Sequence, residues 1–246
     1  MVVFSIETLP SVGSTNDVVR ERALAGAPEG LVVRAVEQLA GRGRHGRGWG
    51  SPPGNLYLSL LLRPERKLAE AATLSLVIGH SLAEAIADAA GPSLGLRLKW
   101  PNDLLAGGAK LAGILLENVS TDTARPVIVA GLGVNLRVAP EGLPYPATTL
   151  RALGLEITPE GLLERLLGQI DRDYALWQAA GFGALRGRWL ERAQGLGEPA
   201  SVRVGERTIS GRFVDVDEAG RLVLEGEAGR RTLSAGEVFF ASEAAL

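Results

Sequence analysis

The stretch LRLKWPNDLLAGGAKLAGILL, residues 96–116, decides the predicted fold. It begins with a short apolar strand, Leu96–Trp100, that the following proline ends, because proline lacks the backbone N–H that a sheet requires. Gly107-Gly108 then separates the apolar runs Leu104–Ala106 and Lys110–Leu116. A glycine pair between two such runs is typical of a β-hairpin. The stretch therefore predicts three consecutive strands, of which the last two form a hairpin.

Apolar runs on both sides extend this pattern. Further strands are expected at Val2–Ile6, Leu31–Glu37, Leu56–Leu62 and Val127–Leu136. Helical spacing of apolar residues and capping signals predict helices at Ser14–Leu24, Lys67–Ala90, Pro159–Ala179 and Phe182–Arg192. Ser14-Thr15-Asn16-Asp17 supplies the N-cap of the first of these helices.

The sequence changes in character near Gly195. Short alternating runs follow at Ser201–Val204, Thr208–Val216, Leu222–Glu225, Arg231–Leu233 and Val238–Phe240. Runs of this length, separated by glycine-containing turns, predict a small β-barrel or sandwich of about five strands. We therefore expect two domains, residues 1–194 and residues 195–246.

Composition excludes several classes of site. The 246 residues carry a formal net charge of −2, so no global positive field attracts nucleic acid or anionic lipid. Without Cys there are no disulfides, thiolate metal sites or Cys nucleophiles, and two His are too few for a multi-histidine metal site. The first residues are unlike a signal peptide, and no apolar run approaches the ~18 residues that span a bilayer. A soluble, cytoplasmic protein is expected.

A segment rich in Gly and Arg gives the first functional signal. Residues 41–49 read GRGRHGRGW and show no apolar periodicity. Glycine lets the backbone approach a ligand closely, and the guanidinium groups of Arg42, Arg44 and Arg47 can hold a carboxylate or phosphate. Mutual repulsion of these charges predicts a loop that is mobile until an anion binds. On composition alone, a solvated basic loop or an RNA contact is an equal alternative.

Lysine is rare in this chain, so its positions are informative. Of the 26 basic residues only Lys67, Lys99 and Lys110 are lysines. Two of the three flank Asn102 and Asp103, which follow a predicted buried strand, the kind of place where open sheets bind ligands. A compact ammonium charge there suits a phosphate or carboxylate oxygen. For either lysine alone, a solvated surface charge is the alternative.

Five motifs in order carry a family resemblance. They are Ser14-Thr15-Asn16 with Gln38, Gly41–Trp49, Lys99–Asp103, Lys110–Gly113 and Gly131–Asn135. Over roughly residues 1–190, the chain resembles the biotin–protein ligases. The similarity is to the form without an N-terminal DNA-binding domain, because the first predicted strand leaves no room for a helix-turn-helix. The resemblance implies an α+β fold with a mixed central sheet flanked by helices, related to class II synthetases, and a small C-terminal SH3-like β-barrel.

The resemblance also implies a two-step reaction. Biotin and ATP with Mg²⁺ would form biotinyl-5′-AMP and pyrophosphate, and the adenylate would then acylate one lysine of a biotin carboxyl carrier protein or domain. No covalent enzyme intermediate is needed, in keeping with the absence of Cys. A homodimer through an edge of the central sheet would be in keeping with the family, whereas DNA and membrane are not expected partners.

The motifs assign roles residue by residue. Biotin-binding residues implied by the resemblance are Ser14, Thr15, Asn16, Gln38, Gly41, Arg42, Gly43, Arg44, Lys110 and Gly113. Those implied for ATP and the adenylate are Arg42, Arg44, Arg47, Trp49, Lys99, Asn102, Lys110 and Asn135. Arg44, Asp103 and Lys110 are the implied catalytic residues, with no resident metal site. Trp49 is expected on the adenine side and Asn135 on the ATP side. A closed loop would protect the adenylate from water.

Two other functions compete with this hypothesis. A lipoate- or octanoate-protein ligase has a similar fold, but the Gly41–Trp49 loop argues against it. An RNA-binding module would use the Arg/Gly loop and the C-terminal strands. The net charge of −2 and the aromatic content of 5% argue against that module.

Several single residues complete the predictions. His45 stands where the family commonly has Arg, and it contributes positive charge only when protonated, so adenylate retention is expected to weaken at alkaline pH. His80 is expected to be structural or at the surface, Trp177 and Trp189 to lie in the core, and Arg186 to be solvated.

Overall fold

A seven-stranded sheet forms the centre of the larger part of the chain. The computed structural model describes residues 1–90, 94–140, 142, 145–227 and 229–240. The strand order is β1-β2-β3-β7-β6-β5-β4, with β1 parallel to β2 and every other neighbouring pair antiparallel. The bounds are β1 Ser5–Val12, β2 Leu31–Gln38, β3 Leu56–Leu62, β4 Leu96–Lys99, β5 Asp103–Ala106, β6 Ala109–Asn118 and β7 Ile128–Val134. The predicted α+β class and the β5–β6 hairpin are confirmed.

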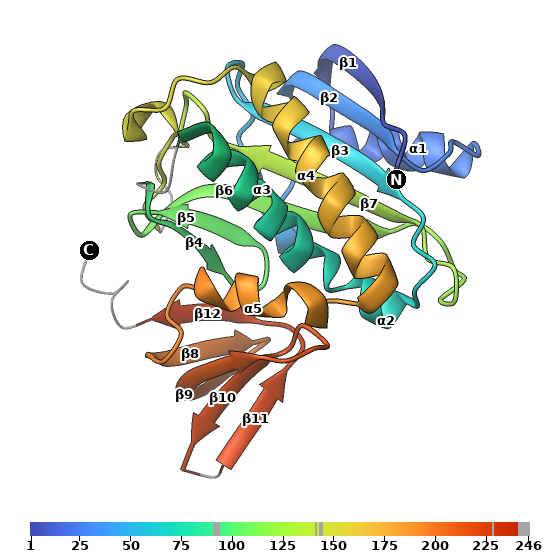
Figure 1. Ribbon diagram of the computed structural model, residues 1–246. Coiled ribbons are helices and arrows are strands. Elements are labelled where there is room, and N and C mark those ends of the chain that lie inside the picture. The colour runs from blue at the N-terminus through green and yellow to red at the C-terminus, as the bar shows by residue number, and fades with distance from the viewer. Residues whose placement is uncertain (91–93, 141, 143–144, 228, 241–246) are drawn as a thin grey trace.

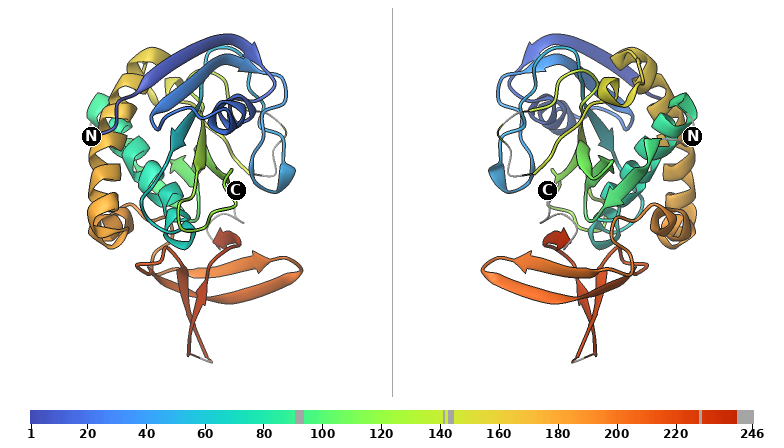
Figure 2. Two further views of the ribbon diagram at one scale, coloured as in Figure 1. Left: turned by 90° about the vertical axis from the view of Figure 1, so that its right-hand side faces the viewer. Right: turned by 90° about the vertical axis from the view of Figure 1, so that its left-hand side faces the viewer.

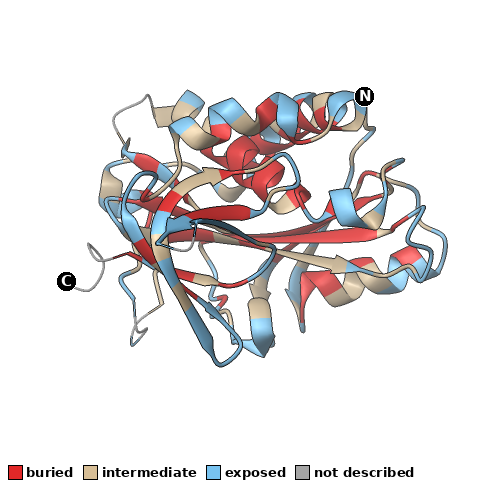
Figure 3. Ribbon diagram, turned by 90° about the horizontal axis from the view of Figure 1, so that it is seen from below, coloured by how far each residue is buried: buried red, intermediate tan, exposed pale blue. Residues whose placement is uncertain are grey.

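Helices cover both faces of this sheet (Figures 1 and 2). Helix α1 (Thr15–Leu24) packs on β2, β3 and β7, whereas α3 (Leu74–Ala90) and α4 (Pro159–Ala180) cover the opposite face. All seven residues of β3 are therefore buried, and Figure 3 shows the buried strands between helices with exposed outer faces. Trp177 and Trp189 are 0% and 1% exposed, which confirms their place in the core. No helix among the described residues is long and apolar enough to cross a membrane.

Two predicted elements are wrong in extent. The strand expected at Val2–Ile6 is β1, which runs through Pro10 to Val12; proline is tolerated because β1 is an edge strand paired only with β2. The helix expected at Lys67–Ala90 is divided into α2 (Leu68–Ala71) and α3. Thr73 lies at the division and its Oγ1 donates to the carbonyl of Glu70 at 2.7 Å, a side-chain bond that competes with regular helix.

A second, five-stranded antiparallel sheet follows α5 (Gly183–Glu191). Its order is β11-β10-β9-β8-β12, with β8 Pro199–Val204, β9 Arg207–Val216, β10 Leu222–Gly226, β11 Gly229–Leu233 and β12 Glu237–Phe240. Arg186 of α5 donates to the Val216 carbonyl at 2.6 Å and pairs with Asp215 of β9. The prediction that Arg186 is solvated is therefore wrong, because this residue joins α5 to the second sheet. The domain boundary near residue 195 stays a prediction.

Candidate active site

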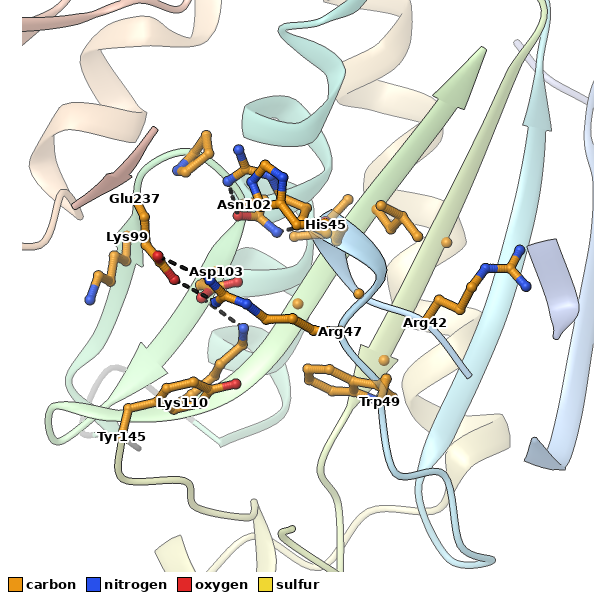
Figure 4. A pocket seen from close by; sticks show the side chains of 18 of the residues that line it. Arg42, His45, Arg47, Trp49, Lys99, Asn102, Asp103, Lys110, Tyr145 and Glu237 are labelled. Atoms are coloured by element: carbon orange, nitrogen blue, oxygen red, sulfur yellow. Dashed lines mark hydrogen bonds and ion pairs between the residues drawn. The ribbon is translucent and has the colours of Figure 1, made fainter. Parts of the chain in front are cut away.

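One cavity of about 860 Å³ lies between the Gly/Arg loop, the β5–β6 hairpin, β7 and β12 (Figure 4). The predicted site residues that line it are Ser14, Thr15, Asn16, Gln38, Arg42, Gly43, Arg44, Arg47, Trp49, Lys99, Asn102, Asp103, Lys110 and Gly113. Gly41 and Asn135 are not among the lining residues. The fold thus brings together fourteen of the sixteen predicted residues from distant parts of the chain.

An uncharged polar wall forms one end of the cavity. Thr15 donates to Gln38 Oε1 from both its backbone N (2.9 Å) and its Oγ1 (3.0 Å). Gln38 Nε2 in turn donates to Ser51 Oγ, and Ser51 donates to the Trp49 carbonyl. Ser14 is the N-cap residue of α1, yet its side chain makes no capping hydrogen bond. Its hydroxyl is therefore not committed to the helix that it precedes, contrary to the predicted capping role.

The three arginines of the Gly/Arg loop contact different elements around the cavity. Arg42 forms two hydrogen bonds of 2.6 and 2.7 Å with Asp17 of α1, and Figure 4 shows its side chain directed away from Lys110. Arg44 donates to Asn102 Oδ1 at 3.2 Å and to a backbone carbonyl beside β12 at 3.4 Å. Burial lowers the pKa of Arg44. The loop is thus connected to α1, to the β4–β5 turn and to the second sheet.

Arg47 forms the strongest connection between the loop and β12. Its two guanidinium nitrogens contact the two oxygens of Glu237 at 2.5 and 3.0 Å. Arg203 of β8 contacts the same carboxylate at 2.5 Å. The hydrogen bond from Arg47, assisted by Arg203, lowers the pKa of Glu237 to about 2.

Lys110 lies at the cationic centre of the cavity. Its Nζ is 2.8 Å from Asp103 Oδ2 and 5.4 Å from the ring centroids of both Trp49 and Tyr145. Two aromatic faces and one carboxylate hold this ammonium group in place. The backbone of Lys110 also donates to the Pro146 carbonyl at 2.8 Å and accepts from the Thr148 N–H at 3.0 Å. A segment far away in sequence therefore holds the lysine in place.

Two glycines form the floor beneath Trp49. A Cβ atom at Gly133 would lie 2.3 Å from Trp49 Nε1, and one at Gly113 would lie 3.2 Å from Trp49 Cζ3. Any larger side chain at Gly133 would displace the ring. Trp49 Nε1 is buried, and no residue that the structure describes forms a hydrogen bond with it. The ring therefore lies flat on β6 and β7 beside Lys110.

Two predicted ATP contacts are placed differently from the rest. Figure 4 shows the Lys99 side chain pointing away from the Asp103–Lys110 pair, and its Nζ lies 5.9 Å from the Phe240 ring. Asn135 is 1% exposed, and within the described part of the chain neither polar atom of its side chain has a partner. Its backbone bonds to Leu111 and Leu150 hold it behind the cavity. Its ATP-side role stays a prediction.

Comparison with known proteins identifies this architecture. The model of the biotin/lipoate A/B protein ligase family matches residues 8–135, more than half of the chain, and that of the biotin protein ligase C-terminal domain matches residues 195–241. The chain belongs to the biotin/lipoate protein ligase family. It is 41% identical to a biotin–[acetyl-CoA-carboxylase] ligase from Paracoccus denitrificans, over 85% of this chain and 89% of the relative.

A longer bifunctional relative and a solved structure also match. A bifunctional ligase/repressor from Escherichia coli is 34% identical over 95% of this chain, which spans 73% of that protein. Among solved structures, the biotin protein ligase from Aquifex aeolicus in complex with biotin and ATP superposes with a TM-score of 0.82 at 30% identity, covering 96% of this chain and 98% of the other.

Four residues that complete this ligase-family site were missed by sequence reasoning. Asp17 and Glu237 are the partners of two loop arginines, Tyr145 covers Lys110, and Ser59 contacts the polar wall. Ser59 had a usable signal, because it is a small hydroxyl residue between leucines in a fully buried strand. Asp17, Glu237 and Tyr145 had no such signal. Their partners, Arg42, Arg47 and Lys110, lie 25, 190 and 35 positions away in the sequence.

Gly133→Ala is expected to weaken the binding of both biotin and ATP. The new methyl group would collide with Trp49, and overpacking of this kind costs about 1–3 kcal/mol. If the Trp49 ring shifts to make room, the cavity loses both its floor and the ring expected on the adenine side. We expect the KM values for biotin and for ATP to rise about tenfold, measured alongside thermal unfolding. Gly187→Ala is the matched control, because a Cβ there meets nothing within 4 Å; equal effects of both variants would contradict the account.

The contact between the loop and β12 is expected to weaken in acid. The folded-state pKa of Glu237, about 2, lies below its ordinary value of 4.5. This group therefore contributes stability above about pH 4.5, and that contribution is lost as the pH falls toward 2. Denaturant unfolding between pH 6 and about pH 2.5 should show a smaller acid-dependent loss of unfolding free energy for Glu237→Gln than for wild type. Parallel pH profiles would show that the contact contributes nothing.

Proposed function

We propose that this protein is an ATP-dependent ligase that activates biotin as biotinyl-5′-AMP and transfers it to a lysine of a biotin carboxyl carrier protein. One observation carries the proposal: a single cavity joins an uncharged polar wall at Thr15 and Gln38, a glycine floor, and a cationic end at Lys110. Biotin has the matching order of groups, with a neutral ureido ring at one end and a carboxylate at the other. The adenylate phosphate would then lie beside Lys110 and Arg44.

In the first step, a carboxylate oxygen of biotin attacks the α-phosphorus of ATP. The new bond is the acyl–phosphate bond, and the bond that breaks releases pyrophosphate. Negative charge gathers on the α-phosphate oxygens during this exchange, and the ammonium of Lys110, already fixed by two rings and Asp103, stabilises it without reorganising. Lys110 thus acts on the reacting atoms, whereas Arg44 would lie beside the adenylate phosphate and hold the loop over it.

Asp103 fits a role toward the metal of MgATP. Its Oδ1 is buried and has no partner among the described residues, while Oδ2 is bound to Lys110. Mg²⁺ binds through one or two carboxylates and substrate phosphates rather than a protein cage, and no cluster of three or more His or acidic residues suited to a metal occurs in the described part of the chain. Asp103 would hold the ion, which would neutralise phosphate charge.

In the second step, the carrier lysine attacks the acyl carbon, AMP departs with the bonding electrons, and the amine loses a proton. Until then the mixed anhydride must be kept from water. The Gly/Arg loop is suited to this task, because Arg44 and Arg47 connect it across the cavity to the segment Gly236–Glu237. The homodimer implied by the resemblance stays a prediction, and β1 is the edge strand available to it, because the outer edge of β4 bonds to Arg192 and Gln194. Sedimentation velocity would test it.

Pyrophosphate release tests the proposal. Biotin and ATP together should give release, and either substrate alone should not. Lipoate or octanoate in place of biotin tests the alternative ligase, because the family also includes lipoate ligases. Release with lipoate or octanoate but not with biotin would contradict the proposal.

A further inference from the structure

Glu117 on β6 lies beside the polar wall, although no motif includes it. Its Oε2 accepts a hydrogen bond of 2.6 Å from Asn16 Nδ2, and its Oε1 accepts one of 2.8 Å from Arg20 Nη2. Its side chain is 25% exposed, and that of Arg20 is 39% exposed. Both contacts are to residues of α1, one turn apart.

The Asn16 side chain is held from three sides. Ser59 Oγ lies 2.5 Å from Asn16 Oδ1, Glu117 accepts from Nδ2, and Gly131 provides the space beneath, since a Cβ there would lie 2.2 Å from Oδ1. Asn16 is 4% exposed and lines the cavity. It therefore presents a fixed edge to a ligand.

Glu117 determines which way the Asn16 amide faces. The Ser59 hydroxyl has one proton, which it can donate either to Asn16 Oδ1 or to Thr15 Oγ1, 2.7 Å away, so Ser59 by itself does not select one orientation of the amide. A carboxylate only accepts. A flipped amide would place Oδ1 against Glu117 Oε2, two acceptors at hydrogen-bond distance, which is unfavourable.

The same carboxylate is connected to the Gly/Arg loop. Arg20, held by Glu117, lies 3.5 Å from Asp17, and Asp17 binds Arg42 through both oxygens. The bond from Arg42 lowers the pKa of Asp17. Glu117, Arg20, Asp17 and Arg42 therefore form a series of alternating negative and positive charges that connects β6, across α1, to the first arginine of the loop.

We propose that Glu117 is a positioning residue for recognition of the acid substrate, through the orientation that it imposes on Asn16. This inference rests on the proposed function, because it places the neutral ring of the acid at Asn16. Glu117 itself touches no reacting atom, and its replacement leaves the Asp17–Arg42 contact in place, so its loss should change binding of the acid and leave the use of ATP intact.

Glu117→Gln tests the inference, because the glutamine amide can accept from Asn16 or donate to it and so permits both orientations. The KM for biotin should rise about 3- to 10-fold, with the KM for ATP and kcat unchanged. Glu7→Gln is the matched control, since Glu7 also pairs with an α1 arginine, Arg22, at 3.3 Å, but outside the cavity. Thermal unfolding of both variants reports on folding.

A double-mutant cycle separates orientation from general damage. In an Asn16→Ala background, Glu117→Gln should change the KM for biotin less than twofold, because no amide remains to be oriented. Full additivity, an equal rise in the KM for ATP, or an unchanged KM for biotin would each overturn the inference. If wild type releases no pyrophosphate with biotin and ATP, the proposed function itself fails, which is a separate outcome.

Discussion

Lys110→Ala should lower biotin-dependent pyrophosphate release at least about 100-fold, the usual effect of removing a fixed donor to developing charge. Lys110 is the cation held closest to the predicted reaction centre, with Asp103 at 2.8 Å and two aromatic rings around it. Its side chain is only 16% exposed. Its loss also removes the ion pair that positions Asp103, the residue proposed to hold the Mg²⁺ of MgATP, which adds to the effect.

Lys67→Ala is the matched control for this prediction. Lys67 is exposed, precedes α2 and does not line the cavity. Pyrophosphate release and thermal unfolding should be measured on both variants. A folded Lys110→Ala protein that keeps more than about a tenth of wild-type activity would show that the lysine does not stabilise the first step.

Arg44→Ala should still form some adenylate, but should release it faster than wild type. Arg44 bonds to Asn102 and to a carbonyl beside β12, so it closes the loop over the cavity. Without it, water and foreign amines can reach the mixed anhydride. We expect about a tenfold or greater rise in biotinylation of a lysine-rich bystander protein, measured by avidin blotting after incubation with biotin and ATP.

Arg221→Ala serves as the comparison for Arg44→Ala. Arg221 pairs with Asp217 in an exposed turn of the second sheet, away from the lining residues. Unchanged leakage from Arg44→Ala, together with lost labelling of the carrier, would assign Arg44 to carrier docking instead.

The regular elements of the fold were predictable where the local sequence determines them. The glycine pair between Ala106 and Ala109 produced the β5–β6 hairpin as expected, and the apolar run Leu56–Leu62 became a buried central strand. The start of β1 and the division between α2 and α3 were not predictable. The first depends on pairing with β2 at the sheet edge, and the second on a Thr73 side chain that also accepts from Trp177 Nε1 at 2.8 Å.

The site was predictable as a set of residues, but not as a geometry. The rarity of lysine drew attention to Lys99 and Lys110 together, yet only Lys110 points to the centre of the cavity (Figure 4). The Gly/Arg loop was found from composition, whereas its carboxylate partners Asp17 and Glu237 depend on how α1 and β12 approach it. His45 has a positive φ of 57° and is exposed in that loop; its effect on adenylate retention stays a prediction.

The most direct measurement is a single turnover in two stages. The protein is mixed with biotin and ATP without carrier, freed of unbound ligands, and analysed for a bound species with the mass of biotinyl-5′-AMP. A biotin carboxyl carrier domain is then added. We expect at most one equivalent of adenylate per chain, with its biotinyl group transferred to the carrier lysine as AMP appears. Failure to form the adenylate, or label on the carrier without prior adenylate, would contradict it.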